Sequence, residues 1–165
     1  MTIQKYVKKC FSSLKGKTVA ITGSTGGLGK AICKHLCPLG ASLILLDRNA
    51  ERSEALAEEL RNTYGVSVDT FRVDHESMES VKAATEYLKM KEPDVLICNA
   101  GAYSIPRRVC DSGYDNVFQI NFISPYYIYI SISFSFKIIS ALSIYLLNHS
   151  SFSVCTGIII SGCAV

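Results

Sequence analysis

Charge is almost missing from the last third of this 165-residue chain. Its 17 basic and 14 acidic residues all lie at or before Asp115, except Lys137. The net charge is only +3, tryptophan is absent, and no stretch is rich in lysine or arginine. A small charge without a basic stripe provides no electrostatic footprint for nucleic acid, so we expect no nucleic-acid partner. The break in composition predicts two unlike parts, residues 1–125 and a hydrophobic tail, residues 126–165.

Paired cysteine spacing is also missing. The seven cysteines are an odd number, and the nearest pair, Cys33 and Cys37, flanks His35 on a predicted helix. Because His35 does not share the face of the two cysteines, we expect no metal site. Reduced, mostly buried thiols are typical of a cytosolic protein. The first residues contain no apolar core of a secretory signal, so we expect a cytoplasmic location.

A glycine-rich stretch, KTVAITGSTGGLGK, spans Lys17 to Lys30. Its apolar run from Thr18 to Ile21 predicts a buried parallel strand, and the pattern after Gly29 predicts an amphipathic helix. The free N–H groups and the dipole of a helix start attract anions, and glycine lets a pyrophosphate approach the backbone. The stretch therefore predicts a dinucleotide site formed by Gly23, Ser24, Thr25, Gly27, Leu28 and Gly29.

Strand and helix patterns then alternate along the chain with short links. This alternation predicts an α/β fold of the Rossmann type, a doubly wound parallel sheet with right-handed crossovers. Because the crossovers reverse at the first strand, we expect the strand order 3-2-1-4. At this length one domain buries roughly 70% of its unfolded surface. The expected strands are 18–21, 42–46, 66–73 and 94–98, and the expected helices are 28–39, 50–64 and 76–91.

Polar residues follow the second and third expected strands, at the edge where ligands of such sheets bind. Asp47 lies 24 residues after Gly23, the place of an acidic residue that takes the adenosine ribose hydroxyls. A carboxylate there repels a 2′-phosphate and favours NAD, whereas Arg48 next to it leaves NADP open. Asp74 and His75 are expected near the adenine, with a helix cap as the alternative role.

Two glycine patterns overlap in the turn, Thr-Gly-x-x-x-Gly-x-Gly and Thr-Gly-x-x-Gly-x-x-Gly. The first resembles the compact branch of the short-chain dehydrogenase/reductase family and the second resembles its extended branch. Asn99, Ala100 and Gly101 follow the fourth strand and match the compact branch, although Cys98 replaces the first asparagine of its motif. The segment SGYDNVFQIN also resembles the family, with Asn121 at the place of the asparagine that holds a water in the proton relay. The resemblance covers about residues 13–125.

This resemblance implies an NAD(P)-dependent oxidoreductase that transfers a hydride between an alcohol or ketone substrate and the nicotinamide. The family's proton path needs a tyrosine and a lysine four residues later. The one Tyr-x-x-x-Lys here, Tyr87 to Lys91, precedes the fourth strand and is expected on an outer helix face. If Ser151 were the family's catalytic serine, no tyrosine would follow it at the required distance. We therefore expect a truncated, inactive chain.

The tail departs from the family pattern after Pro125. Residues Tyr127 to Phe136 alternate with a period of two, which predicts a strand. Residues 138–147 are too short for a membrane span unless they join the segment before Lys137, so we expect no membrane contact by the tail and keep a transmembrane tail as the alternative. Gly157 to Ser161 is the best candidate for a fifth strand. Three hypotheses stay open. The chain is an incomplete oxidoreductase, or a non-catalytic nucleotide- or partner-binding module whose tail contacts a membrane or a protein, or a chain whose tail is an out-of-frame product.

Overall fold

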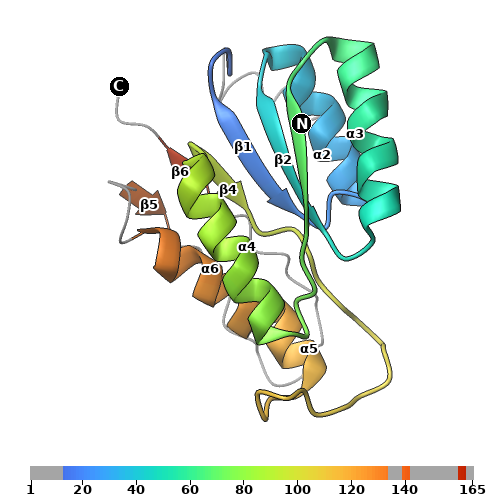
Figure 1. Cartoon of the computed structure of the whole chain (residues 1–165), viewed down its shortest axis with the longest axis vertical. Coiled ribbons are helices and arrows are strands. Elements are labelled where there is room, and N and C mark those ends of the chain that lie inside the picture. The colour runs from blue at the N-terminus through green and yellow to red at the C-terminus, as the bar shows by residue number, and fades with distance from the viewer. Residues whose placement is uncertain (1–12, 134–138, 142–159, 163–165) are drawn as a thin grey trace.

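The structure is a computed structural model that describes residues 13–133, 139–141 and 160–162 (Figure 1). Strands and helices alternate through its first part, as the sequence predicts. The strands are β1 (Thr18–Thr22), β2 (Ser42–Asp47), β3 (Val68–Arg72), β4 (Val95–Ile97), β5 (Ile139–Ala141) and β6 (Ile160–Gly162). The helices are α2 (Gly27–Leu36), the 3-10 turn η1 (Cys37–Leu39), α3 (Ala50–Tyr64), α4 (Met78–Lys91), α5 (Asn116–Phe118), the π-helical turn η2 (Gln119–Ile123) and α6 (Ser124–Ser133).

The main sheet has four parallel strands in the order β3-β2-β1-β4, which confirms the predicted order. Val19 pairs with Leu43 on one side and with Val95 on the other. Because the connection reverses at β1, the carboxyl ends of β1 and β4 lie side by side at the switch point where ligands of such sheets bind. The sheet therefore sets the position of the site before any side chain is considered.

Two apolar layers hold the helices on the sheet. Alternate residues of β1 and β2 point to opposite faces, as the pleat requires. Val19 and Leu43 belong to the core under α2 and α3, whereas Ala20 and Ile44 belong to the core under α4 and α6. Figure 1 shows the two pairs of helices on the two faces. Strands buried on both faces explain the continuous apolar runs in the sequence.

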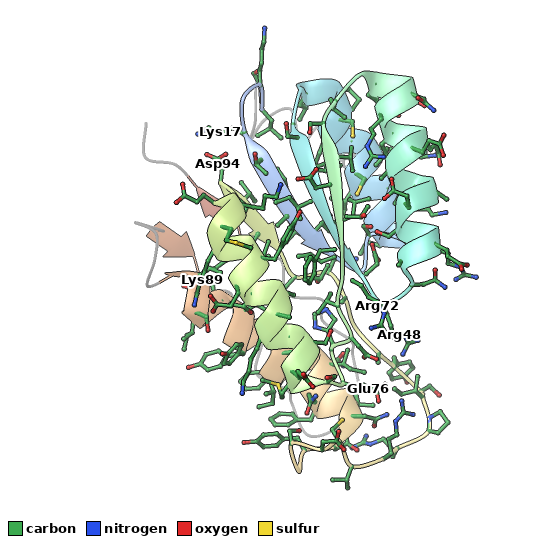
Figure 2. All side chains as sticks on the ribbon, viewed as in Figure 1. Lys17, Arg48, Arg72, Glu76, Lys89 and Asp94 are labelled. Carbon is green, nitrogen blue, oxygen red and sulfur yellow. The ribbon has the colours of Figure 1, made fainter. Side chains whose placement is uncertain are left out.

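Polar contacts set the ends of the elements. Asn49 accepts a hydrogen bond from Arg52 N at the start of α3, and Gly65 ends that helix with φ +66°. Glycine adopts this left-handed conformation without the cost that a Cβ imposes. At the amino edge of the sheet, Asp94 accepts bonds from Thr18 N at 2.8 Å and from Lys17 Nζ at 2.9 Å. These bonds tie the starts of β1 and β4 together, at the end of the molecule opposite to the site (Figure 2).

The predicted strand from Tyr127 to Phe136 is wrong over its described part, which is helix α6. Ile128 and Ile132 are fully buried in the core under α4, while Ile130 between them is only partly buried. Spacing of four residues places the two buried isoleucines on one helical face. The period of two arises because serines and tyrosines separate the isoleucines. The same residues also fit a helix that packs on a largely apolar surface, so the pattern alone did not distinguish strand from helix. The ordered packing thus continues past residue 125 as far as Ile132.

The described residues after α6 form a separate two-stranded sheet. β5 and β6 pair antiparallel, with Ser140 opposite Ser161. β6 overlaps the predicted fifth strand, Gly157 to Ser161, and lies against β4, but it does not join the four-stranded sheet. Within the ranges described above, no helix is long and apolar enough to cross a membrane.

Candidate functional site

Two glycines of the turn after β1 are needed for packing. Gly23 has φ +67°, and a Cβ there would lie 2.9 Å from Ala100 Cα. A Cβ at Gly29 would lie 2.3 Å from the carbonyl oxygen of Gly23 and 2.7 Å from Ser24 Cα. Neither contact is sterically allowed, and the atoms in question belong to the backbone. Gly23 and Gly29 therefore allow the turn, the start of α2 and the residues after β4 to lie in contact.

At two further positions of the turn, packing within the protein does not require glycine. A Cβ at Gly27 would meet nothing within 4 Å, and one at Gly26 would meet only Gly23 O at 3.5 Å. Gly26 caps α2 without a side-chain hydrogen bond, and no acidic residue lies in the first turn. Gly27, Leu28 and Gly29 line a cavity at this helix start, where the positive end of the helix dipole lies. Glycine at these positions fits a ligand that approaches the backbone, and an anion suits it electrostatically.

A cavity of about 630 Å³ opens at this helix start, a size that suits a cofactor. Most of the predicted cofactor residues line this cavity: Gly23, Thr25, Gly27, Leu28, Gly29, Asp47, Arg48, Asp74, His75, Asn99, Ala100 and Gly101. Ser24 and Asn121 do not line it. Lining residues absent from the prediction include Gly26, Asn49, Arg52, Glu76, Ala102, Tyr103, Ile105 and Ile120. Glu76 follows Asp74 by two residues, and its position shortly after a predicted strand is the signal that could have indicated it.

Asp47 lies under the glycine turn and is only 3% exposed. Its Oδ1 accepts from Thr25 N at 3.1 Å and from Thr25 Oγ1 at 3.0 Å. Its Oδ2 accepts from Ser53 Oγ at 3.1 Å and from Ser24 Oγ. Four donors therefore occupy the carboxylate within the protein. These bonds to Asp47 fix the conformation of the turn. Because the surrounding protein has a low dielectric constant, the field of the carboxylate extends into the cavity.

Asn99 joins the ends of β1 and β4. Its Nδ2 donates to Thr22 O at 3.1 Å and to Gly23 O at 2.9 Å. Thr22 Oγ1 in turn accepts from the backbone N–H groups of Asn99 and Ala100 at 3.0 and 2.9 Å. The side chain of Asn99 is thus committed to the turn. It positions the floor of the cavity between Gly23 and Gly101.

His75 lines the cavity and is 8% exposed, and neither ring nitrogen has a hydrogen-bond partner. Burial lowers the pKa of its imidazole to about 4, against the opposing charges of Asp74 and Asp47. The ring is therefore neutral at pH 7. Asp74, its neighbour, lines the cavity and also accepts from Glu76 N at 3.0 Å. The cap of α4 is Ser77, whose side chain accepts from Ser80 N at 3.3 Å, so the alternative role of Asp74 as the helix cap is wrong. Its place near the adenine stays a prediction.

Asn121 lies on the π-helical turn η2 between α5 and α6. Its Oδ1 accepts from Ala102 N at 2.7 Å, and its Nδ2 donates to Ala102 O at 2.9 Å. This pair of bonds ties the helix to the segment that follows Gly101. Single π turns often mark functional sites because they turn a side chain away from the regular helix face.

Tyr87 and Lys91 lie away from the cavity, on α4 as the sequence predicts. The Tyr87 ring stacks on Phe71 with 4.4 Å between centroids, and Lys91 Nζ lies 5.5 Å from the centre of the Tyr87 ring. Lys91 also pairs with Asp69 at 2.8 Å. The pair is a surface feature between α4 and β3.

Comparison with known proteins gives three kinds of similarity. The family model described as short chain dehydrogenase matches residues 17–137. The short chain dehydrogenase resG of Aspergillus sclerotiorum is 36% identical over 120 residues, which are 70% of this chain and 33% of that protein. The NADPH-dependent 3-quinuclidinone reductase of Rhodotorula rubra is a structural neighbour with a TM-score of 0.63 and 32% identity. That alignment covers 76% of this chain and 49% of the reductase.

The L-sorbose reductase of Gluconobacter frateurii, solved with NADPH and L-sorbose, aligns with a TM-score of 0.65 and 26% identity over 74% of this chain and 48% of its own. The present chain spans about a third of the length of the curated relatives and about half of these structures. The family match extends past Pro125 through α6, in agreement with the helix found there. With the fold, the glycine turn and these matches together, the chain belongs to the short-chain dehydrogenase family.

Proposed function

We propose that this chain is the dinucleotide-binding part of an NAD(P)-dependent oxidoreductase that acts on a hydroxyl or carbonyl group. The observation that carries the proposal is the open space over Gly27, at a helix start that has no side-chain cap and lines the cavity. The bound cofactor would accept or deliver a hydride. Gly23 and Gly29 shape its cradle, and Asn99 and Asp47 hold the cradle in place. Four free thiols among the described residues support a reducing, cytoplasmic setting.

The proposal includes a preference for NAD over NADP. Its support is electrostatic, because the four internal donors leave Asp47 as a buried negative charge beside the cavity. Such a charge opposes a 2′-phosphate, while Arg48 in the same cavity attracts it.

Titration of the full chain should show tighter binding of NADH than of NADPH, by roughly tenfold, or about 1.4 kcal/mol. The variant Asp47→Asn removes the charge at nearly constant volume and should narrow this gap. Calorimetry of both dinucleotides measures the two affinities, and a thermal melt reports the hydrogen bonds lost at the turn. The control is Asp69→Asn, which removes the same charge outside the cavity lining. Equal affinities in the wild type would contradict the preference.

We further propose that these 165 residues bind the cofactor without catalysis, since their one Tyr-x-x-x-Lys lies off the cavity. Mixed with NADH and a series of ketones, the chain should leave the near-ultraviolet absorbance of NADH unchanged. A steady decrease that disappears in Asn121→Ala would contradict this. The position of Tyr87 and Lys91 outside the cavity also favours the alternative function, a non-catalytic nucleotide-binding module. This alternative predicts binding without turnover for any extended form as well.

A further inference from the structure

Glu76 holds two arginines that come from different parts of the chain. Its Oε2 lies 2.5 Å from Arg108 Nη2, and its Oε1 lies 3.8 Å from Arg48 Nη1. Arg48 follows the carboxyl end of β2, whereas Arg108 belongs to the segment after β4. Figure 2 shows Arg48 and Glu76 at the same end of the molecule. One carboxylate thus connects two segments that border the cavity.

The backbone of Glu76 is fixed on both sides. Its N–H donates to Asp74 Oδ1 at 3.0 Å, and its carbonyl oxygen accepts from Gln119 Nε2 at 2.5 Å. Its side chain is 13% exposed, whereas that of Arg48 is 69% exposed. The carboxylate therefore stays in place, and the arginine is the partner that can move.

The two ion pairs differ in strength. Arg108 makes a close contact, whereas the 3.8 Å separation from Arg48 is near the limit of an ion pair. A guanidinium binds a phosphate through two parallel hydrogen bonds, which is stronger than such a loose pair. Asp47 and Asp74 add negative charge to the same cavity, and Arg52 adds positive charge. Positive and negative charges around the cavity nearly balance, so one carboxylate can decide whether a phosphate is favoured there.

We propose that Glu76 is a specificity-determining residue that holds Arg48 and so disfavours a phosphate at the 2′ position of the adenosine ribose. The inference rests on the proposed dinucleotide function. Glu76 acts through Arg48: it neutralises the guanidinium that a 2′-phosphate would use. Without its charge, Arg48 is available to the phosphate, and the chain accepts NADPH more readily.

The test compares NADH and NADPH affinities of the full chain by calorimetry. Glu76→Gln should raise NADPH affinity about tenfold and leave NADH affinity within about twofold. The same substitution in an Arg48→Ala background should change the ratio little, because the residue through which Glu76 acts is gone. Glu79→Gln removes an exposed carboxylate in the first turn of α4, outside the cavity lining, and should leave the ratio unchanged.

Each alternative result is informative. An unchanged ratio in Glu76→Gln overturns the inference alone, provided that the wild type binds a dinucleotide. A full gain of NADPH affinity in the Arg48→Ala background also overturns it, since Glu76 would then act by direct repulsion. If Glu76→Gln does not fold, Glu76→Met repeats the comparison with the aliphatic stem kept. Failure of the wild type to bind either dinucleotide overturns both the proposed function and this inference.

Discussion

The variant Gly29→Ala is expected to lose dinucleotide binding and most of its folding stability. The added Cβ would lie 2.3 Å from the carbonyl oxygen of Gly23 and 2.7 Å from Ser24 Cα. Both are backbone atoms at the centre of the turn, so relief requires that α2 move away from β1. Ser24 would then leave Asp47, and a buried carboxylate would lose donors. Overpacking and the lost hydrogen bonds together should cost several kcal/mol, about 3 or more. Urea unfolding followed by circular dichroism measures this loss.

Gly27→Ala is the matched comparison, and its free energy of unfolding should not fall as that of Gly29→Ala does. A Cβ at Gly27 meets nothing, and alanine favours a helix over glycine by about 1 kcal/mol. Stability should therefore stay equal or rise, while NADH affinity falls at least about tenfold because the methyl group occupies the approach to the phosphates. Unchanged NADH affinity in a stable Gly27→Ala variant would refute the position assigned to the cofactor.

The sequence predicts the sheet because its local and long-range signals agree. The run from Thr18 to Ile21 is apolar because β1 is buried on both faces, and the glycines after it permit a single tight turn. Gly65 ends α3 where expected, since its left-handed conformation is one that glycine adopts freely. Strand order follows from the crossover rule and needs no knowledge of individual contacts.

Residues whose roles depend on contacts between distant segments were harder to predict. The ribose role of Asp47 stays a prediction, but its bonds from Ser24, Thr25 and Ser53 could not be foreseen from the sequence. Glu76 was not among the predicted site residues, because its partners Arg48 and Arg108 lie 28 and 32 residues away in sequence. Chain spacing does not report such pairings. The helix α6 was missed for a related reason, since burial of Ile128 and Ile132 depends on α4 packing beside it.

His75 should make the stability of the chain depend on pH between about 4 and 6.5. Burial lowers its pKa in the folded state to about 4, whereas an unfolded chain has the ordinary value of 6.5. Between these values the unfolded state binds more protons, so stability is fully present above pH 6.5 and is lost as the pH falls toward 4. A difference of this size corresponds to roughly 3 kcal/mol. Urea unfolding of the wild type at a series of pH values measures the loss.

The variant His75→Leu should remove this pH dependence and also stabilise the chain at pH 7. The two ring nitrogens are buried without partners, and an apolar side chain of similar volume removes that cost of about 1–3 kcal/mol. Carboxylates titrate in the same window, so the relevant quantity is the difference between wild type and variant. His35→Gln controls for loss of a histidine that is only partly buried and should keep the wild-type profile. A variant His75→Leu with the same pH profile as the wild type would show that the imidazole finds a proton acceptor or water that stabilises its charge. A stability gain at pH 7 combined with weaker NADH binding would instead indicate that the unpaired ring is retained for the ligand.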